Sequence, residues 1–365
     1  MKFTISRSRF IEALKSVQNI VAAKGSIPIL QNVMITAKGD SITLATTDLD
    51  ITIMCSVPCT VNDEGASTLP VKILFNLIAK APEVEIEVEV DNAEQATIRA
   101  GSARYKLNGK PVADFPKFGA EGESLEYLIP CKTLQEMLKK TSYASSQDDT
   151  RRTLKGVLMS FRNQKLTMVA TDGRRLALVE KEMEFAGSSE RDIVLPSKAV
   201  QELLRSLGDD GDARLNVSSS RISFTVGELR IYSKLIDDSY PDYMKVIPEK
   251  CEFTICVDRV MLLSALERAN VMTIDEAHSV KMTFEPNRLV VASAVSEIGE
   301  AKDEVAVKYA GEKVEIMFNP NYVMDPLKVI DDDEVIININ NGHSPAVIRC
   351  SSIPFLYVIM PLRIS

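Results

Sequence analysis

The sequence repeats one pattern three times, and this repeat limits the possible fold more than any other feature. The three stretches are KFTISRSRFIEAL, EYLIPCKTLQEML and EFTICVDRVMLLSAL, which begin at Lys2, Glu126 and Glu252. Each predicts a short strand followed by an amphipathic helix. Within them Ile5, Ile129 and Ile255 lie 124 and 126 residues apart. A repeat at a nearly constant interval indicates tandem units of one architecture.

A second landmark repeats at the same interval. In STLPVKILFNLIAKAP, IVLPSKAVQELLRSLGD and IMFNPNYVMDPLKVIDD, the residues Pro70, Pro196 and Asn319 coincide, 126 and 123 residues apart. More than one domain is expected for 365 residues, because single cores stop growing beyond about 250–300 residues. The two landmarks together predict three domains, at residues 1–121, 126–248 and 251–365.

Each predicted domain consists of two half-units, because roughly three strand patterns follow each helix. The clearest is VEIEVEV, in which Val84, Ile86, Val88 and Val90 are expected to face the core. The stretches SITLATT, KLTMVAT and RLVVASA hold equivalent places in the three first halves. The predicted fold class is α+β, with six helices packed on antiparallel sheets.

The composition excludes several classes of protein. Hydrophobic residues make up 45% and charged residues 26%, as in soluble globular proteins. No apolar run approaches the roughly 20 residues needed to span a bilayer, and the start has no apolar segment of a secretory signal. The six cysteines form no Cys-x-x-Cys pair and only two histidines are present. We therefore expect reduced cysteines, no zinc site and a cytoplasmic location.

Charge is distributed unevenly over the predicted elements. The chain has a formal net charge of −8. The predicted helices, at residues 7–20, 71–80, 132–140, 197–207, 259–268 and 320–330, together carry +8, which leaves −16 for the remainder. One explanation is chance, since lysine and arginine are good helix formers. The other is that all six helices face one polyanion and contact its phosphates without reading bases.

Tandem repeats with basic helices and acidic sheets resemble the bacterial DNA sliding clamp, the beta subunit of DNA polymerase III. The stretches LPSKAVQELLR, ATDGRRLA, LIDDSYPDY, ADFP and YVIMPLRIS are similar to signatures of that family. The resemblance covers the whole chain and is looser in the first and third domains. It implies a DNA-clamp fold: a head-to-tail ring of two chains, with sheets outside and helices lining a hole around duplex DNA. Many weak phosphate contacts let such a ring slide.

The resemblance also implies a non-catalytic role as a processivity factor for DNA replication, with no cofactor and no metal. The implied partners are a second copy, double-stranded DNA, a replicative polymerase subunit, a clamp loader and other proteins with a clamp-binding motif, but no membrane. The residues that match the family's DNA contacts are Lys24, Lys72, Arg151, Arg152, Lys198 and Arg205.

Family partners insert a short extended peptide with apolar side chains between the second and third domains. The matching pocket positions are Leu154, Thr171, Gly173, Arg174, Arg175, Leu176, Pro241, Val246, Tyr322, Val358, Met360, Pro361 and Leu362. Where this chain has Arg174, family members often have histidine, so the pocket rim is expected to prefer more acidic peptides. The structural alternative for residues 358–362 is an ordinary final strand.

Ring closure implies contacts between the first domain of one chain and the third domain of the other. Tyr105 and Leu107 are expected to meet Val271 and Met272 of the partner chain. The charged residues expected beside this seam are Arg104, Lys106, Glu297, Glu300 and Glu304.

The stretch VATDGRRLALV (169–179) has the residue types of a phosphate or sugar site, of a hairpin turn and of a docking surface. Its first-domain counterpart is LATTDLDITI, in which Thr47 and Asp48 lie 124 residues before Thr171 and Asp172. The third copy, VASAVSEIGEA, has neither the Asp-Gly turn nor the arginines. Thr-Asp is therefore interpreted as a turn, and the residues Gly173–Leu176 as a docking surface whose arginines meet a partner.

Two other classes of protein stay open on the sequence. The acidic run Asp331–Glu334 could hold a divalent cation in a metal-dependent nucleic-acid enzyme, although a solvated turn between a helix and a strand is the simpler interpretation. No phosphate-binding loop, nucleophile elbow or histidine pair at ligand spacing is present. A monomeric repeat scaffold that binds only proteins would share the apolar C-terminal groove but needs no closed dimer.

Overall fold

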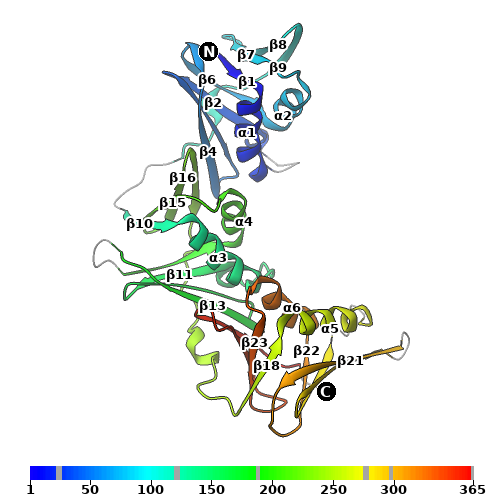
Figure 1. The fold of residues 1–365 in the computed structure, drawn as a ribbon. Helices are drawn as coiled ribbons and strands as arrows, with labels where there is room; N and C mark the ends of the chain where they lie inside the picture. Colours follow the sequence, from blue (N-terminus) through cyan, green and yellow to red (C-terminus); the bar gives the residue numbers. More distant parts are fainter. Residues whose placement is uncertain (22–26, 119–123, 186–189, 274–278, 296–298, 363–365) are drawn as a thin grey trace. The chain divides into compact units, whose positions relative to one another are not determined.

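The computed structural model describes the chain except for residues 22–26, 119–123, 186–189, 274–278, 296–298 and 363–365 (Figure 1). The described chain divides into two units. The first unit comprises Met1–Gln135 with Gln201–Leu235, and the second comprises Glu136–Val200 with Ile236–Ser365.

Six α-helices are present among the described residues, and each follows directly on a strand or its end. They are α1 (Arg7–Val17), α2 (Val71–Lys80), α3 (Cys131–Thr141), α4 (Ser197–Ser206), α5 (Arg259–Val271) and α6 (Pro320–Val329). Short 3-10 helices span Gln18–Ile20, Pro28–Gln31, Val112–Asp114, Ser142–Ala144, Arg152–Lys155 and Tyr243–Val246. All six helices predicted from the sequence are confirmed, because apolar residues recur on one face of each.

The first unit contains two antiparallel sheets. Its strands are β1 (Lys2–Ser6), β2 (Asn32–Lys38), β3 (Ser41–Thr47), β4 (Ile51–Pro58), β5 (Thr60–Asp63), β6 (Gly65–Pro70), β7 (Glu85–Val90), β8 (Gln95–Ala100), β9 (Ala103–Asn108), β10 (Leu125–Pro130), β15 (Asp212–Val217), β16 (Arg221–Val226) and β17 (Leu229–Lys234). One sheet has the strand order β5-β1-β7-β8-β9, and the other the order β10-β15-β16-β17-β4-β3-β2-β6.

The second unit contains a sheet of 12 strands in the order β14-β11-β12-β13-β25-β24-β23-β18-β21-β20-β19-β22. Its strands are β11 (Gly156–Arg162), β12 (Lys165–Thr171), β13 (Arg175–Glu182), β14 (Arg191–Pro196), β18 (Phe253–Asp258), β19 (Val280–Glu285), β20 (Arg288–Val295), β21 (Gly299–Lys308), β22 (Val314–Phe318), β23 (Glu334–Ile339), β24 (Ala346–Arg349) and β25 (Phe355–Ile359). The predicted α+β class with antiparallel sheets is confirmed.

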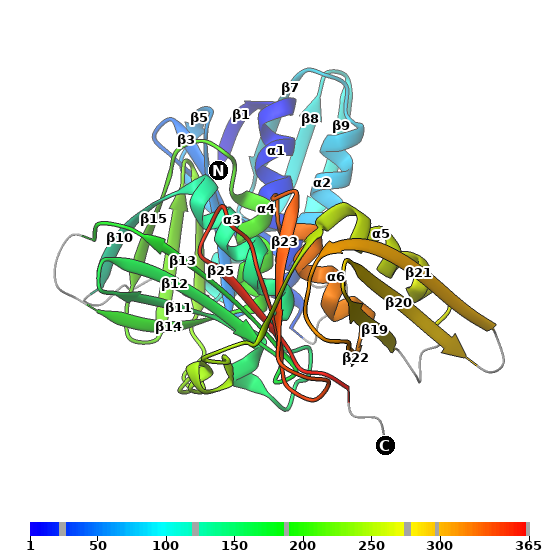
Figure 2. The same cartoon turned by 60° about the horizontal axis from the view of Figure 1, so that its bottom comes forward.

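Helices pair within each unit and cover the sheets. In the first unit α1 lies beside α2, and in the second unit α5 lies beside α6 (Figure 2). The alternation predicted for VEIEVEV is confirmed for Ile86, Val88 and Val90, which are buried. It is wrong for Val84, which is 37% exposed. This residue precedes β7, and its carbonyl accepts the N–H of Arg7 (3.3 Å) where the chain enters the strand.

Two strand pairings join half-units that belong to different predicted domains. In the first unit β4 pairs with β17, with Cys55 opposite Leu229. In the second unit β13 pairs with β25, with Val179 opposite Phe355. The second pair lies 124 and 126 residues further along the chain than the first, so one junction occurs twice. The second predicted domain thus supplies four strands to a sheet of each unit, β10, β15, β16 and β17 in the first and β11 to β14 in the second. Its boundaries remain an expectation from the repeat.

Candidate functional site

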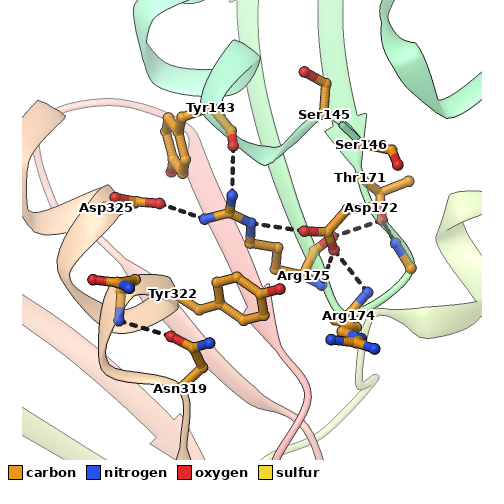
Figure 3. A network of polar contacts seen from close by, with 12 residues as sticks. Tyr143, Ser145, Ser146, Thr171, Asp172, Arg174, Arg175, Asn319, Tyr322 and Asp325 are labelled. Atoms are coloured by element: carbon orange, nitrogen blue, oxygen red, sulfur yellow. Dashed lines mark hydrogen bonds and ion pairs between the residues drawn. The ribbon is translucent and has the colours of Figure 1, made fainter. Parts of the chain in front are cut away.

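The residues between β12 and β13 form a tight turn (Figure 3). Asp172 Oδ1 accepts the backbone N–H groups of Arg174 (2.8 Å) and Arg175 (3.1 Å). Thr171 Oγ1 accepts the N–H of Gly173 at 3.1 Å and donates to the carbonyl of Arg175 at 2.6 Å. Gly173 has φ +86°, a left-handed conformation that glycine adopts without steric cost. The predicted Asp-Gly corner is confirmed.

The first copy of the repeat makes the same turn with an equivalent Thr-Asp pair, Thr47 and Asp48. Asp48 Oδ1 accepts the N–H groups of Asp50 (3.0 Å) and Ile51 (2.8 Å), and Thr47 Oγ1 accepts the N–H of Leu49 at 3.1 Å. Leu49 has φ +81° although it is not a glycine. The Thr-Asp pair is therefore a structural turn motif, and it is not in itself a functional site.

The two arginines of the second copy lie in different surroundings. Arg174 is exposed, whereas the side chain of Arg175 is only 11% exposed. Nε of Arg175 donates to Asp172 (3.0 Å), Nη2 donates to the carbonyl of Tyr143 (2.7 Å), and Nη1 donates to Asp325 (Figure 3). At least three of its five N–H donors are thus used within the protein, and the expectation that Arg175 also meets a partner stays a prediction.

Aromatic rings complete the surroundings of Arg175. Its guanidinium carbon lies 4.4 Å from the ring centroid of Tyr322 and 5.8 Å from that of Tyr143, within the range of cation–π attraction. Burial opposes the charge, but Tyr357 and Asp325 favour it, and the pKa of Arg175 lies above its usual value. The hydroxyl of Tyr357 donates to the carbonyl of Tyr322 at 2.9 Å. Arg175 therefore stays a cation inside a closed cluster.

The other pocket residues predicted from the sequence lie in this same unit. Leu176 and Val358 are buried in one hydrophobic cluster, against which Tyr240 and Tyr243 pack. The remaining positions are Leu154 (half-buried), Thr171 (buried), Pro241 (exposed), Val246 (47% exposed), Met360 (42% exposed), Pro361 (half-buried) and Leu362 (36% exposed). The N–H of Met360 donates to the carbonyl of Arg174 at 2.9 Å. This contact joins the end of β25 to the turn.

Sequence reasoning missed Met244 beside these residues. It is 61% exposed and lies in the same 3-10 helix as Val246, next to Tyr243, which packs on the hydrophobic cluster. The signal was the run YMKV, in which two apolar residues flank a lysine directly after Pro241 and Asp242. We name the residues Met244, Val246, Met360 and Leu362 the apolar rim.

The candidate DNA contacts are mostly exposed helix residues. Lys72 is exposed on α2, and Lys198 and Arg205 are exposed on α4. Arg205 pairs with the buried Glu202, and it lines a cavity of about 890 Å³ together with Arg9 and Lys15 of α1. Lys24 lies outside the described residues.

Arg151 and Arg152 are exposed at the start of a 3-10 helix. Nη1 of Arg151 donates to the carbonyl of Asp172 at 2.9 Å, and its Nε lies 3.7 Å from a carboxylate oxygen of Asp148. Arg151 therefore braces the turn that contains Gly173, so a role in DNA contact would be in addition to a structural one.

Three helix cations are used inside the protein. Arg7 donates to the carbonyls of Ile78 (3.1 Å) and Ala79 (2.7 Å) at the end of α2. Arg259 of α5 donates to the carbonyls of Leu327 (3.0 Å) and Asp332 (2.8 Å) at and beyond the end of α6. The third, Lys140 of α3, is buried and its Nζ lies 3.4 Å from Asp331. The helix charge counted from the sequence is therefore larger than the charge that faces solvent.

The residues expected at a dimer seam lie on two strands and at a helix end. On β9, Arg104 and Lys106 are exposed, whereas Tyr105 and Leu107 are half-buried. On β21, Glu300 and Glu304 belong to the exposed row; Glu297 lies outside the described residues. Val271, the last residue of α5, is 77% exposed, and Met272 lies close to Gly299 at the start of β21.

Residues of the acidic run 331–334 form ion pairs and hydrogen bonds within the protein. Asp331 pairs with Lys140, and Asp332 accepts the N–H groups of Ser351 and Ser352 (both 3.0 Å). In the described part of the chain, no group of His, Cys, Asp and Glu side chains could hold a metal ion. All six cysteines are free thiols. None of the described helices is long and apolar enough to cross a membrane.

The tandem strand–helix–three-strand half-units, joined by antiparallel strand pairing, define a protein of the DNA-clamp class. Models of the three DNA polymerase III beta subunit domains match the chain in order: the N-terminal domain at residues 1–119, the central domain at 128–242 and the C-terminal domain at 244–363. The chain belongs to the DNA polymerase III beta subunit family, whose members are beta sliding clamps of DNA replication.

Individual relatives agree with this assignment over their full length. The chain is 34% identical to the beta sliding clamp of Chlamydia muridarum, covering 100% of this chain and 99% of that protein. It is similar to the crystal structure of a sliding clamp from Pseudomonas aeruginosa with TM-score 0.95 and 30% identity, covering 100% of both chains. It is also similar to a sliding clamp from Bartonella birtlesii bound to griselimycin, with TM-score 0.94, 33% identity and 100% coverage of both chains.

Proposed function

We propose that two copies of this chain close into a ring around duplex DNA and act in the cytoplasm as a processivity factor. The ring tethers the replicative polymerase and other partners and performs no reaction of its own. The observation that supports this most is the repeated strand junction. β4 with β17 and β13 with β25 are two copies of one junction, and the same interval makes β21 and β9 the strands of a third copy.

Both strands have edges available for that third junction. Within the described residues β9 pairs only with β8. β21 pairs along its length with β20, but with β18 only at Val307 and Lys308. An unpaired strand edge is a template for pairing with another chain. Because the two edges differ, pairing between copies is head-to-tail, and two such seams complete a closed dimer.

The register of the first two junctions sets the register of the seam. Adding 124 residues to Val179 of β13 gives Asp303 of β21, and subtracting 126 from Leu229 of β17 gives Ala103 of β9. Ala103 is therefore expected opposite Asp303 of the partner chain, and Lys106 opposite Glu300. Arg104 then lies diagonally between Glu300 and Glu304, within reach of long side chains in an antiparallel pair. In this register Lys302 lies directly opposite Arg104, so the exposed row of β21 has mixed charge, and Lys106 with Glu300 is the directly opposed pair of opposite charge. The other rows include Tyr105 and Leu107 of β9, and Ala301 and Asp303 of β21.

The helices provide a surface suited to the DNA backbone. With the observed bounds, α1 to α4 each have more basic than acidic residues, and the exposed cations include Lys72, Lys198 and Arg205. Cations on exposed helix faces contact phosphates and carry no base information. A closed ring needs only such weak contacts, because topology prevents its escape.

The apolar rim and the turn at Gly173 form the partner site in this proposal. Their exposed apolar side chains stand next to a rigid cluster, which suits an extended peptide with one or two apolar anchors. Arg174 is exposed at the rim and favours an acidic flank on that peptide. The related clamp from Bartonella birtlesii is bound to griselimycin, and we propose that griselimycin also binds this chain at the partner site, which makes it a probe of that site.

Light scattering tests ring assembly. The proposal expects a mass of 80.6 kDa, twice the 40.3 kDa of one chain. A mass of 40.3 kDa at micromolar concentration would instead favour the monomeric repeat scaffold.

A further inference from the structure

Arg175 places a buried charge at the junction of β13 and β25. Its guanidinium bonds Asp172 on the turn, the carbonyl of Tyr143 and Asp325 on α6, and it stacks on the ring of Tyr322 (Figure 3). Burying an ion pair seldom stabilises a fold more than apolar residues of similar size would. The cluster therefore calls for an explanation other than stability.

The other copy of the junction shows what the fold itself requires. The residue equivalent to Arg175 is Ile51, 124 residues earlier, which is 2% exposed and lies at the start of β4. The residue equivalent to Asp325 is Glu202, which is buried and pairs with Arg205 of its own helix. A junction with the same strand pairing and the same turn thus forms around an isoleucine. The ion cluster is an addition made only in the second unit.

The cluster connects residues that border the partner site. Asp172, which accepts from Arg175 Nε, also accepts the N–H of Arg174 and so fixes the turn at Gly173. Tyr322 lies on α6 under the guanidinium face. One side chain thereby sets the distance between the turn and α6.

We propose that Arg175 is a positioning residue of the partner site, which holds the turn at Gly173 and the ring of Tyr322 at a fixed spacing so that the groove is formed before a partner arrives. This inference rests on the proposed function of that surface. Pre-forming a groove strengthens binding because less disorder has to be removed on association. The partner needs no contact with Arg175 itself. Lysine cannot replace it, since a single ammonium lacks the planar fork that reaches three acceptors.

Binding of griselimycin, measured by calorimetry on the full chain, tests the inference. We expect Arg175→Ile, Arg175→Lys and Asp325→Asn each to weaken binding at least tenfold, with faster dissociation. Their dimer mass should stay unchanged. Their melting temperature should fall, because Asp172, Asp325 and the carbonyl of Tyr143 lose a charged donor, so binding is compared at a temperature where every variant is folded. The control is Lys140→Met, which breaks another ion pair with the third predicted domain, Lys140 with Asp331, away from the turn at Gly173. This variant should bind within about threefold of the unchanged chain.

A double-substitution cycle separates positioning from general loosening. Tyr322→Ala should weaken binding in the unchanged chain. It should cause little further loss of affinity in Arg175→Ile, because the ring of Tyr322 is no longer held by the guanidinium in that variant. If Arg175→Ile and Arg175→Lys bind griselimycin as tightly as the unchanged chain does, Arg175 has no positioning role and the inference is wrong. If the unchanged chain itself does not bind, the proposed partner site is wrong and this inference falls with it. The two failures are thus distinguishable.

Discussion

Leu49 and Gly173 lie 124 residues apart and adopt the same left-handed backbone conformation, with φ +81° and +86°. Both occupy the third position of a Thr-Asp turn in which the same oxygens accept the same N–H groups. The hydrogen bonds of the turn therefore impose a left-handed backbone at this position, whichever residue occupies it. Glycine meets that demand without strain, whereas leucine does not.

Leu49→Gly should stabilise the protein. We expect the free energy of unfolding of the first unit to rise by about 0.5–1 kcal/mol, because the strain of a non-glycine residue exceeds the entropy that glycine adds to the unfolded chain. Leu49 is 46% exposed, so little apolar burial is removed. Denaturant titration followed by circular dichroism measures the change.

The matched substitution at the second turn is Gly173→Ala. It should lower stability, since it introduces strain at a positive φ and places Cβ 3.0 Å from Nη1 of Arg151. Equal effects of the two substitutions would show that the turn does not impose this conformation.

Arg7 and Arg259 should matter more for stability than their place on basic helices suggests. Each donates two hydrogen bonds to carbonyls at or near the end of a neighbouring helix. Replacing either with methionine removes charged donors and leaves those carbonyls unsatisfied, which should cost about 2 kcal/mol. Thermal unfolding measures the decrease.

Lys72→Met provides the control for both arginines. Lys72 is an exposed helix cation, so its replacement should change stability by no more than about 0.5 kcal/mol. A decrease as large as that for Arg7→Met would mean that the capping hydrogen bonds are not the cause.

Charge reversal on one strand of the proposed seam should abolish the dimer, and mixing two variants with complementary reversals should restore it. The double variants Arg104→Glu with Lys106→Glu, and Glu300→Lys with Glu304→Lys, each place like charges across both seams of a homodimer. Each should give 40.3 kDa by light scattering. Mixed together they should form an 80.6 kDa heterodimer, because one seam is then native and the other has both charges reversed. Failure of the mixture to dimerise would contradict the register proposed for β9 and β21.

Reversing helix charge should weaken DNA binding without opening the dimer. Lys72→Glu with Lys198→Glu should reduce the affinity for short linear duplex DNA at low salt. It should also flatten the salt dependence by about 0.9 for each phosphate that the helices no longer neutralise. Lys281→Glu, on strand β19 and paired with Glu315, is the control. If the strand variant has the larger effect, DNA does not face the helices.

Local patterns predicted the elements of the fold. Helices and strands follow from apolar periodicity, and the repeat of Ile5, Ile129 and Ile255 predicted their order. Val84 was the exception, because an alternating pattern does not indicate where a strand begins. The pairing of β4 with β17 was not predicted, since residues 55 and 229 carry no local sign of each other. For the same reason, the division of the second predicted domain between two units could not be anticipated.

The candidate site was predicted in its residues but not in its geometry. Arg174 and Arg175 are neighbours of the same type, and their sequence gives no sign that one is exposed and the other bonded to Asp325, 150 residues further on. A signal did exist for the capping arginines. Arg7 and Arg259 both stand at the first position of a helix in equivalent copies of the repeat. The recurrence of arginine at this position indicates a structural role, since a residue that only faces solvent need not recur.

Retention on DNA of different topology tests the central claim most directly. The chain is assembled with a clamp loader on nicked circular DNA, and its comigration with that DNA is followed by gel filtration at moderate salt. We predict that it stays on the circle for many minutes and dissociates rapidly once a restriction enzyme linearises the circle, because a closed dimer leaves only over an end. Equally fast dissociation from circular and linear DNA would contradict the ring.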